Sequence, residues 1–199
     1  MGRSNVGKST LINALTRRRL ARTSAAPGKT RLANIYRVQR GSNPPLYLVD
    51  LPGYGYARGG DGSAREFADL TRAYFGQEGR DVRALLLVDA RHPGLASDLA
   101  AWHWLMETVA DAAVVATKID KLARGERIRA MRELESVLEH AVLPVSAVTG
   151  EGLDELWKWM DRQANNPQPP RRSPLSRSSR LLKATARSRP GETKAGPRR

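Results

Sequence analysis

The chain alternates short apolar runs with longer segments whose apolar residues recur at helical spacing. Each strand-length run ends in a polar or small residue, and the runs occupy residues 46–50, 84–90, 112–117 and 141–147. Two longer segments carry apolar stripes of helical period, namely Leu99, Trp102, Met106 and Val109, and Leu153, Leu156, Trp157 and Met160. Short strands separated by such helices indicate an α/β fold of three layers around a mostly parallel sheet. Ligands of these sheets bind at the carboxyl ends of the strands, which directs attention to the residues after each run.

A phosphate-binding motif lies at the amino terminus. Residues 2–9 read GRSNVGKS, fit the pattern G-x-x-x-x-G-K-[ST] and lead into a helical segment. Backbone N–H groups of such a loop wrap phosphate groups, and the positive end of the helix dipole adds to their attraction. We expect Lys8 to reach the β- and γ-phosphates and Ser9 to coordinate Mg²⁺.

The later run ends supply further parts of a nucleotide site. After residues 46–50 comes the pattern D-x-x-G, in which Asp50 is expected to hold Mg²⁺ through a water and the Gly53 N–H to approach the γ-phosphate. A switch also needs a threonine that closes on the metal, and Thr23 and Thr30 are the candidates. Thr30 is favoured because it lies in a Pro-Gly-Lys-Thr turn before a predicted strand, although an ordinary loop threonine explains it too.

The last two run ends are suited to a guanine base. Residues 112–117 lead into Thr117-Lys118-Ile119-Asp120, whose aspartate is placed to accept the two N–H donors of guanine. Adenine lacks this donor pair and would leave a buried carboxylate unpaired, at a cost of about 1–3 kcal/mol or more. A backbone N–H at Ser146-Ala147 is expected to meet the guanine O6. Four such motifs in this order specify a GTP-binding domain.

Several segments together resemble the EngB (YihA) family of bacterial P-loop GTPases of the TRAFAC class. The resemblance covers residues 2–160 and rests on GRSNVGKSTLINAL, ARTSAAPGKT, DLPGYGYA, LLLVDARHP, TKIDKL and VSAVTGEGLDEL. It implies a P-loop NTPase fold and a cytoplasmic, monomeric, Mg²⁺-dependent GTPase with GTP and GDP as ligands. It also implies a role in ribosome assembly, of the large subunit, and in normal cell division and septation, with a ribosomal subunit or rRNA as partner.

The resemblance also implies a set of site residues, carried over motif by motif. Catalytic roles fall to Lys8, Thr30 and Gly53, and Mg²⁺ binding to Ser9 and Thr30. The implied nucleotide contacts are Gly2, Arg3, Ser4, Asn5, Val6, Gly7, Lys8, Ser9, Gly28, Lys29, Thr30, Arg31, Leu32, Asp50, Leu51, Pro52, Gly53, Thr117, Lys118, Ile119, Asp120, Val145, Ser146 and Ala147.

Two residues bear on the hydrolysis rate. Tyr54 stands where Ras-like switches have the glutamine that orients the attacking water, so we expect slow intrinsic hydrolysis unless another group or the partner completes the site. Asn5 resembles the asparagine of potassium-stimulated GTPases, which makes K⁺ a candidate cofactor. The alternative function is a nucleotide-gated RNA- or ribosome-binding module whose hydrolysis is incidental.

The strand expected to lead into the phosphate loop is not in the sequence, because Gly2 directly follows Met1. In a doubly wound sheet this first strand is central, and its loss exposes the edges of both neighbours. Our hypothesis is that Met1 is an internal residue of a longer natural chain.

Composition divides the chain into a domain and a tail. The 199 residues include 34 Lys and Arg, 20 Asp and Glu, and no Cys, which excludes a disulfide scaffold and a Cys-ligated metal site. Residues 165–199 are rich in Pro, Ser and Arg and carry +9 of the formal +14 charge. We expect residues 1–164 to form the G domain and the tail to be disordered, and either to bind RNA phosphates or merely to aid solubility. No apolar run is long enough for a membrane span.

Overall fold

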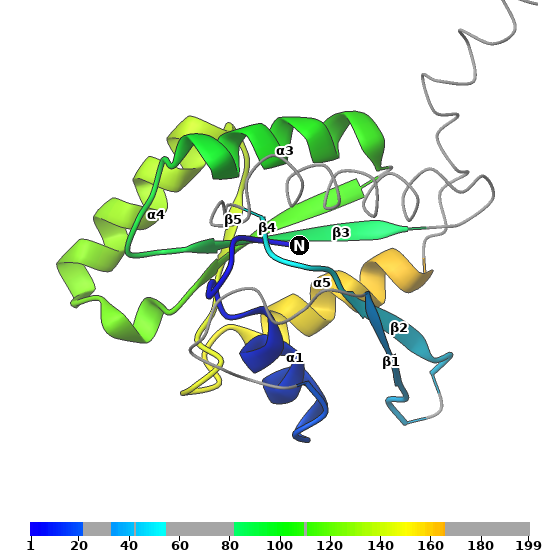
Figure 1. The fold of residues 1–199 in the computed structure, drawn as a ribbon. Coiled ribbons are helices and arrows are strands. Elements are labelled where there is room, and N and C mark those ends of the chain that lie inside the picture. The colour runs from blue at the N-terminus through cyan, green and yellow to red at the C-terminus, as the bar shows by residue number, and fades with distance from the viewer. Residues whose placement is uncertain (22–32, 42, 55–81, 110, 166–199) are drawn as a thin grey trace, which may run out of the picture.

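The computed structural model describes residues 1–21, 33–41, 43–54, 82–109 and 111–165 (Figure 1). Helices and strands alternate along these residues, which confirms the predicted α/β class. In chain order the elements are α1 (Lys8–Thr16), β1 (Asn34–Val38), β2 (Leu46–Asp50), β3 (Arg83–Asp89), α3 (Ala96–Thr108), β4 (Asp111–Thr117), the 3-10 helix η2 (Ile119–Lys121), α4 (Arg124–Leu138), β5 (Val142–Pro144) and α5 (Leu153–Asn165).

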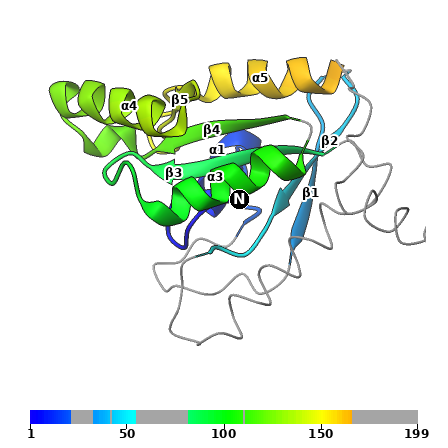
Figure 2. The same ribbon diagram turned by 90° about the horizontal axis from the view of Figure 1, so that it is seen from above.

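A parallel sheet in the order β3–β4–β5 forms the middle layer of the molecule. Because side chains alternate between the faces of a strand, Leu86 and Val114 pack with residues of α3 and α4. Leu87 and Val115 instead pack with residues of α1 and α5 on the opposite face. Figure 1 shows these helix pairs on either side of the sheet, as the three-layer prediction requires, and Figure 2 looks down through the layers, with α3 in front of the sheet and α1 behind it.

The predicted apolar stripe of α3 is confirmed except at one residue. Trp102 and Val109 are buried and Leu99 packs against the core, but the Met106 side chain is 45% exposed. Asp98 and Leu105 are also buried, although the predicted stripe did not include them. The Trp102 indole N–H donates to the Leu138 carbonyl at 3.1 Å, which fixes the rotation of α3 against α4. A pattern of apolar residues alone does not find the buried Asp98.

Strands β1 and β2 form a separate antiparallel pair with a more open surface. Ile35 and Tyr47 are each 62% exposed. Between this pair and β3 lies the amino terminus, where the Leu87 N–H donates to the Met1 carbonyl at 2.9 Å and Gly2 bridges Leu87 in parallel. The Met1 ammonium donates to the Leu85 carbonyl at 2.6 Å, and burial lowers its pKa to about 5.

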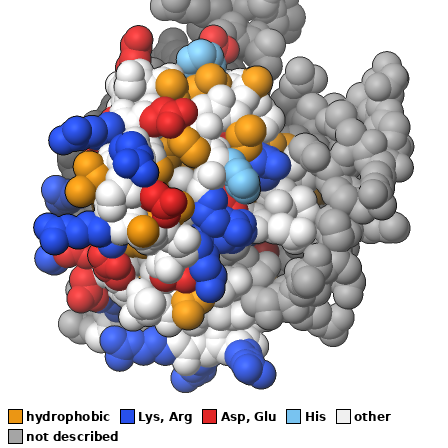
Figure 3. Space-filling view, turned by 90° about the vertical axis from the view of Figure 1, so that its left-hand side faces the viewer, with side chains coloured by type: hydrophobic (Ala, Val, Ile, Leu, Met, Phe, Trp, Pro, Cys, Tyr) orange, Lys and Arg blue, Asp and Glu red, His pale blue; other side chains and the backbone are white. Residues whose placement is uncertain are grey.

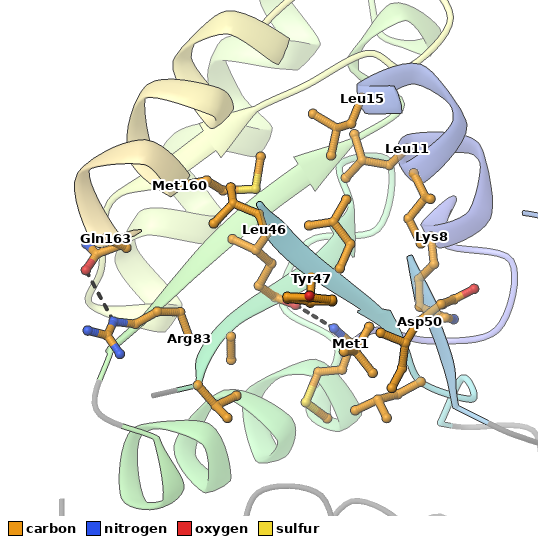
Figure 4. A pocket seen from close by; sticks show the side chains of 18 of the residues that line it. Met1, Lys8, Leu11, Leu15, Leu46, Tyr47, Asp50, Arg83, Met160 and Gln163 are labelled. Carbon is orange, nitrogen blue, oxygen red and sulfur yellow. Dashed lines mark hydrogen bonds between the residues drawn. The ribbon is translucent and has the colours of Figure 1, made fainter. Parts of the chain in front are cut away.

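A cavity of about 680 Å³ lies between the two sheets. Figure 4 shows Lys8 and Asp50 near one end and Arg83 and Gln163 at the other. Its apolar lining comes from both sheets and from both helices of the lower layer, and includes Met1, Leu11, Leu48, Leu85, Leu87 and Met160. The described strands on its two sides are therefore not hydrogen-bonded to each other. The hypothesis about residues before Met1 stays a prediction.

Helix α5 is the last described element and ends at Asn165. The predicted tail, residues 165–199, lies outside the described residues except for Asn165, which ends α5, so its character stays a prediction. Among the helices that the structure describes, none combines the length and apolar character that crossing a membrane requires.

Candidate GTP-binding site

The phosphate loop is stabilised by contacts within the loop and by its neighbours. Helix α1 begins at Lys8, directly after Gly7 at φ 109°, and Val6 anchors the loop in the core at 2% exposure. The Lys8 ammonium donates to the Gly2 and Arg3 carbonyls at 3.1 and 2.9 Å. These two hydrogen bonds hold the loop over the start of α1, where the helix dipole favours an anion.

Ser9 and Asp50 meet beside the loop and are suited to Mg²⁺. The Ser9 hydroxyl lies 3.4 Å from Asp50 Oδ2, while the buried Oδ1 atom of Asp50 accepts no hydrogen bond. An unsatisfied buried carboxylate oxygen is costly without a partner, and hydroxyl and carboxylate oxygens are ligands that Mg²⁺ prefers. Burial raises the pKa of Asp50, and the charge of Lys8 opposes that rise. A bound cation would oppose it further.

Gly53 packs directly on the phosphate loop. A Cβ added there would lie 2.7 Å from the Ser4 amide nitrogen and 2.9 Å from Lys8 Nζ, so a larger residue would clash with the loop. The Ser4 N–H donates to the Tyr54 carbonyl at 3.1 Å. The Tyr54 hydroxyl donates to Asp98 at 2.9 Å, so it is directed to α3.

The carboxyl end of β4 is tied to the phosphate loop. The buried Thr117 hydroxyl lies 2.7 Å from the Val6 carbonyl and 3.0 Å from the Val88 carbonyl. Lys118, at φ 61°, donates to the Asn5 carbonyl at 2.6 Å and to Asp89 at 2.9 Å. These contacts join the predicted phosphate and base motifs into one site.

Asp120 and the turn after β5 form the base end. The Ser146 hydroxyl donates to Asp120 Oδ1 at 2.7 Å, and this bond lowers the pKa of Asp120. The same hydroxyl oxygen accepts the Val148 and Thr149 N–H groups, and the Ser146 N–H donates to Glu151. Of these described turn residues, Ala147 keeps an N–H with no protein acceptor, as a contact with guanine O6 requires.

The sequence comparison with known proteins agrees with this geometry. Residues 1–118 match the family described as 50S ribosome-binding GTPase. The probable GTP-binding protein EngB of Chlorobaculum tepidum is 43% identical over 164 residues, covering 81% of this chain and 83% of that protein. The chain belongs to the EngB family. It is a GTP-binding protein of a GTPase family, as predicted.

Solved structures place this EngB-family chain among P-loop GTPases. A crystal structure of a probable GTP-binding protein EngB gives a TM-score of 0.63 at 23% identity, covering 81% of this chain and 95% of that one. Era in complex with MgGDPNP and nucleotides 1506–1542 of 16S ribosomal RNA gives 0.67 at 25% identity. This second match covers 80% of the chain but only 53% of Era.

One group of predicted contacts in the EngB-family site is not described. Gly28, Lys29, Thr30, Arg31 and Leu32 lie outside the described residues, and so does the alternative Thr23. The structure does bring together Gly2–Ser9, Asp50–Gly53, Thr117–Asp120 and Val145–Ala147 at one edge of the sheet. Their individual roles toward GTP stay predictions.

Sequence reasoning missed Asp89 in this EngB-family site. Asp89 ends β3, pairs with Lys118 at 2.9 Å and accepts two hydrogen bonds from the Arg91 side chain at 2.9 and 2.8 Å. Burial raises the pKa of Asp89, but the bonds from Arg91 and Lys118 lower it well below its usual range. The search of the residues after each apolar run passed over Asp89, because Asp89 lies within the run at 84–90 and ends β3 itself.

Proposed function

We propose that this chain is a Mg²⁺-dependent GTPase switch that acts in the cytoplasm on a ribosomal particle during large-subunit assembly, and that normal cell division and septation need it. The observation that carries the nucleotide part is the pairing of Asp120 with Ser146 beside the Ala147 amide, 26 residues apart in sequence. The ribosomal part is supported by the family description and by the RNA bound to Era.

Ser9 and Asp50 are the described residues that we propose for Mg²⁺, Ser9 directly and Asp50 through a water. The orphaned Asp50 Oδ1 atom and the nearby Ser9 hydroxyl support this choice. When bound, Mg²⁺ would neutralise charge that develops on the phosphates during hydrolysis. Lys8 holds the phosphate chain, and the Gly53 N–H is proposed to contact the terminal phosphate. Thr30 is proposed as the second protein ligand of the metal.

Co-sedimentation with purified ribosomal subunits tests the partner and the switch together. We expect the chain to pellet with large subunits in a non-hydrolysable GTP analogue and to remain in the supernatant in GDP. Asp120→Asn loaded with the corresponding xanthosine triphosphate analogue should restore pelleting, whereas the same variant with the GTP analogue should not. Equal pelleting in both nucleotide states contradicts the proposed switch.

A nucleotide-gated binding module is the second candidate. It is favoured by Tyr54, which stands where a glutamine orients the attacking water in Ras-like GTPases. The Tyr54 hydroxyl donates to Asp98, so it does not perform that role. Multiple-turnover phosphate release with and without large subunits separates the candidates. A rate that subunits raise at least tenfold supports the GTPase switch, and an unchanged slow rate supports the module.

Potassium stimulation rests on Asn5, which adopts φ 61° at the tip of the phosphate loop. We propose that K⁺ supplies positive charge near the phosphates. GTP turnover should then be faster in KCl than in NaCl at equal ionic strength, and equal rates in the two salts contradict this.

The basic tail is the proposed RNA contact. Figure 3 shows basic and acidic side chains interspersed on the face that includes α4, so the described residues of this face form no patch of one sign. Deleting residues 165–199 should weaken rRNA binding and flatten its dependence on the logarithm of salt concentration. Unchanged binding and slope would favour the solubility role.

A further inference from the structure

Asp98 is a buried acid that the nucleotide site does not use directly. It lies in the first turn of α3 and is only 4% exposed. Burial raises its pKa, while the Tyr54 hydroxyl and the charge of Arg3 oppose that rise. A buried carboxylate costs several kcal/mol unless it is hydrogen-bonded. The 2.9 Å hydrogen bond from the Tyr54 hydroxyl therefore strongly favours the observed position of the Tyr54 side chain.

Tyr54 is hydrogen-bonded through both its side chain and its backbone. Its hydroxyl donates to Asp98 on α3, and its backbone carbonyl accepts the Ser4 N–H of the phosphate loop at 3.1 Å. Arg3 also bridges Tyr54 as a parallel β-bridge. The residue that follows Gly53 therefore joins α3 to the phosphate loop.

This position of Tyr54 holds Gly53 over the loop. A single carbon added to Gly53 would come within 2.7 Å of the Ser4 nitrogen and 2.9 Å of Lys8 Nζ. A phosphate oxygen at that point would be at hydrogen-bond distance from both nitrogens but only one covalent bond length from the Gly53 Cα, so no oxygen fits there. A third phosphate cannot therefore contact the Ser4 amide and Lys8 from this side while Gly53 stays in place.

We propose that the Tyr54–Asp98 hydrogen bond is a latch that holds Gly53 against the phosphate loop and thereby disfavours nucleotides with a third phosphate over GDP. Asp98 is then a positioning residue that acts through Tyr54. The proposal rests on the assignment of Ser4, Lys8 and Gly53 to the nucleotide site. GDP lacks the third phosphate and needs no movement of Gly53. A GTP analogue must first open the latch, so its apparent affinity falls by the fraction of open molecules.

Tyr54→Phe removes the latch hydroxyl and keeps the ring that packs against the core. Titration with fluorescent GDP and with a fluorescent non-hydrolysable GTP analogue, both in Mg²⁺, measures the two dissociation constants. We expect the Kd of the analogue to fall about 10- to 100-fold, which corresponds to losing one hydrogen bond to a charged group. The Kd of GDP should stay within about twofold of its original value, because GDP is compatible with both states. Tyr47→Phe, an exposed tyrosine of β2, is the matched control and should change neither constant.

Asp98→Asn tests the other partner, since the amide oxygen can still accept the hydrogen bond but carries no charge. It should shift the GDP-to-analogue ratio in the same direction by a smaller factor, and the double variant should shift it no further than Tyr54→Phe alone. An unchanged ratio in Tyr54→Phe with normal GDP affinity overturns the latch, as do equal changes in both constants or additive effects in the double variant. Failure of the original chain to bind either nucleotide contradicts the site assignment instead.

Discussion

The two ends of the nucleotide site are supported very differently by the fold. At the base end, Thr117 and Ser146 are 5% and 0% exposed, and protein contacts already hold Asp120 in place. At the phosphate end, Asp50 carries an unsatisfied buried oxygen. It ends β2, which pairs only with β1 among the described strands and is separated from the main sheet by the cavity.

The difference indicates that the base end is rigid and that the phosphate end is able to move. The base end lies on the β3–β4–β5 sheet between two helical layers, so it is rigid enough to discriminate between bases by unpaired hydrogen bonds. The phosphate end lies where Gly53 approaches the loop, and the proposed latch predicts that this contact changes with the nucleotide. Regions with few buried contacts are where functional movement occurs in proteins. The predictions below perturb one end and compare it with the other.

Lys8→Ala should have the largest effect, because it breaks the phosphate end alone. It removes the ammonium that arches the loop through the Gly2 and Arg3 carbonyls and that is expected to bind the phosphates. Losing charge-assisted hydrogen bonds to two phosphates should weaken GTP binding by about 3–6 kcal/mol. Calorimetric titration measures this, with Lys158→Ala, an exposed lysine of α5, as the matched control. Affinity within tenfold of the original would place the phosphates elsewhere.

Gly152→Ala should destabilise the base end through the backbone beside Val145, since an added Cβ would lie 3.2 Å from the Val145 Cα. Gly152 adopts φ 78°, and an added Cβ would clash with the Pro144 carbonyl oxygen next to Val145. The variant should lose about 3 kcal/mol of unfolding free energy by urea denaturation. Gly150→Ala is the control, since φ is 87° there but no atom lies within 4 Å of the added carbon. It should lose only about 1–2 kcal/mol from backbone strain. Equal losses in the two variants would show that strain, not the clash, governs this turn.

Asp120→Asn sharpens the comparison by changing base recognition while leaving the phosphate end intact. An amide opposes one N–H donor of guanine with another donor, so GTP affinity should fall about 10- to 100-fold. Affinity for xanthosine triphosphate should rise, because its base offers an acceptor at that edge. Competition between the two nucleotides measures the change, with the exposed Asp154→Asn as control. An unchanged preference contradicts the base-recognition assignment.

The sequence predicted the base end better than the phosphate end, for physical reasons. Asp120, Ser146 and Ala147 follow apolar runs that form buried strands, and local pattern is enough to place them. A strand after Thr30 was also expected, and β1 lies there, but its antiparallel pairing with β2 depends on contacts that no local period reports. Asp98 was missed because its burial depends on a partner, Tyr54, that lies 44 residues away. Met106 was predicted on the buried stripe of α3, but Leu105 beside it is buried in its place.

Breaking the ion pairs of Asp89 with Lys118 and Arg91 should change the free energy of unfolding least. This change tests how the base end is coupled to the phosphate loop. Burial raises the pKa of Asp89, but hydrogen bonds from Arg91 and Lys118 lower it well below the unfolded value of about 3.9. A depressed pKa means that Asp89 stabilises the fold above about pH 4 and that this stability is lost as the pH falls further.

The half-exposed Arg91 is partly screened by solvent, so the contribution at pH 7 should be only about 1 kcal/mol. Urea denaturation of the original chain and of Asp89→Asn at pH 7 and at pH 3 measures it. The original chain should lose more stability between the two pH values than the variant does, with Asp154→Asn as the exposed control. Equal pH dependence in the original chain and in Asp89→Asn would show that Lys118 is held over Asn5 by the loop carbonyl alone.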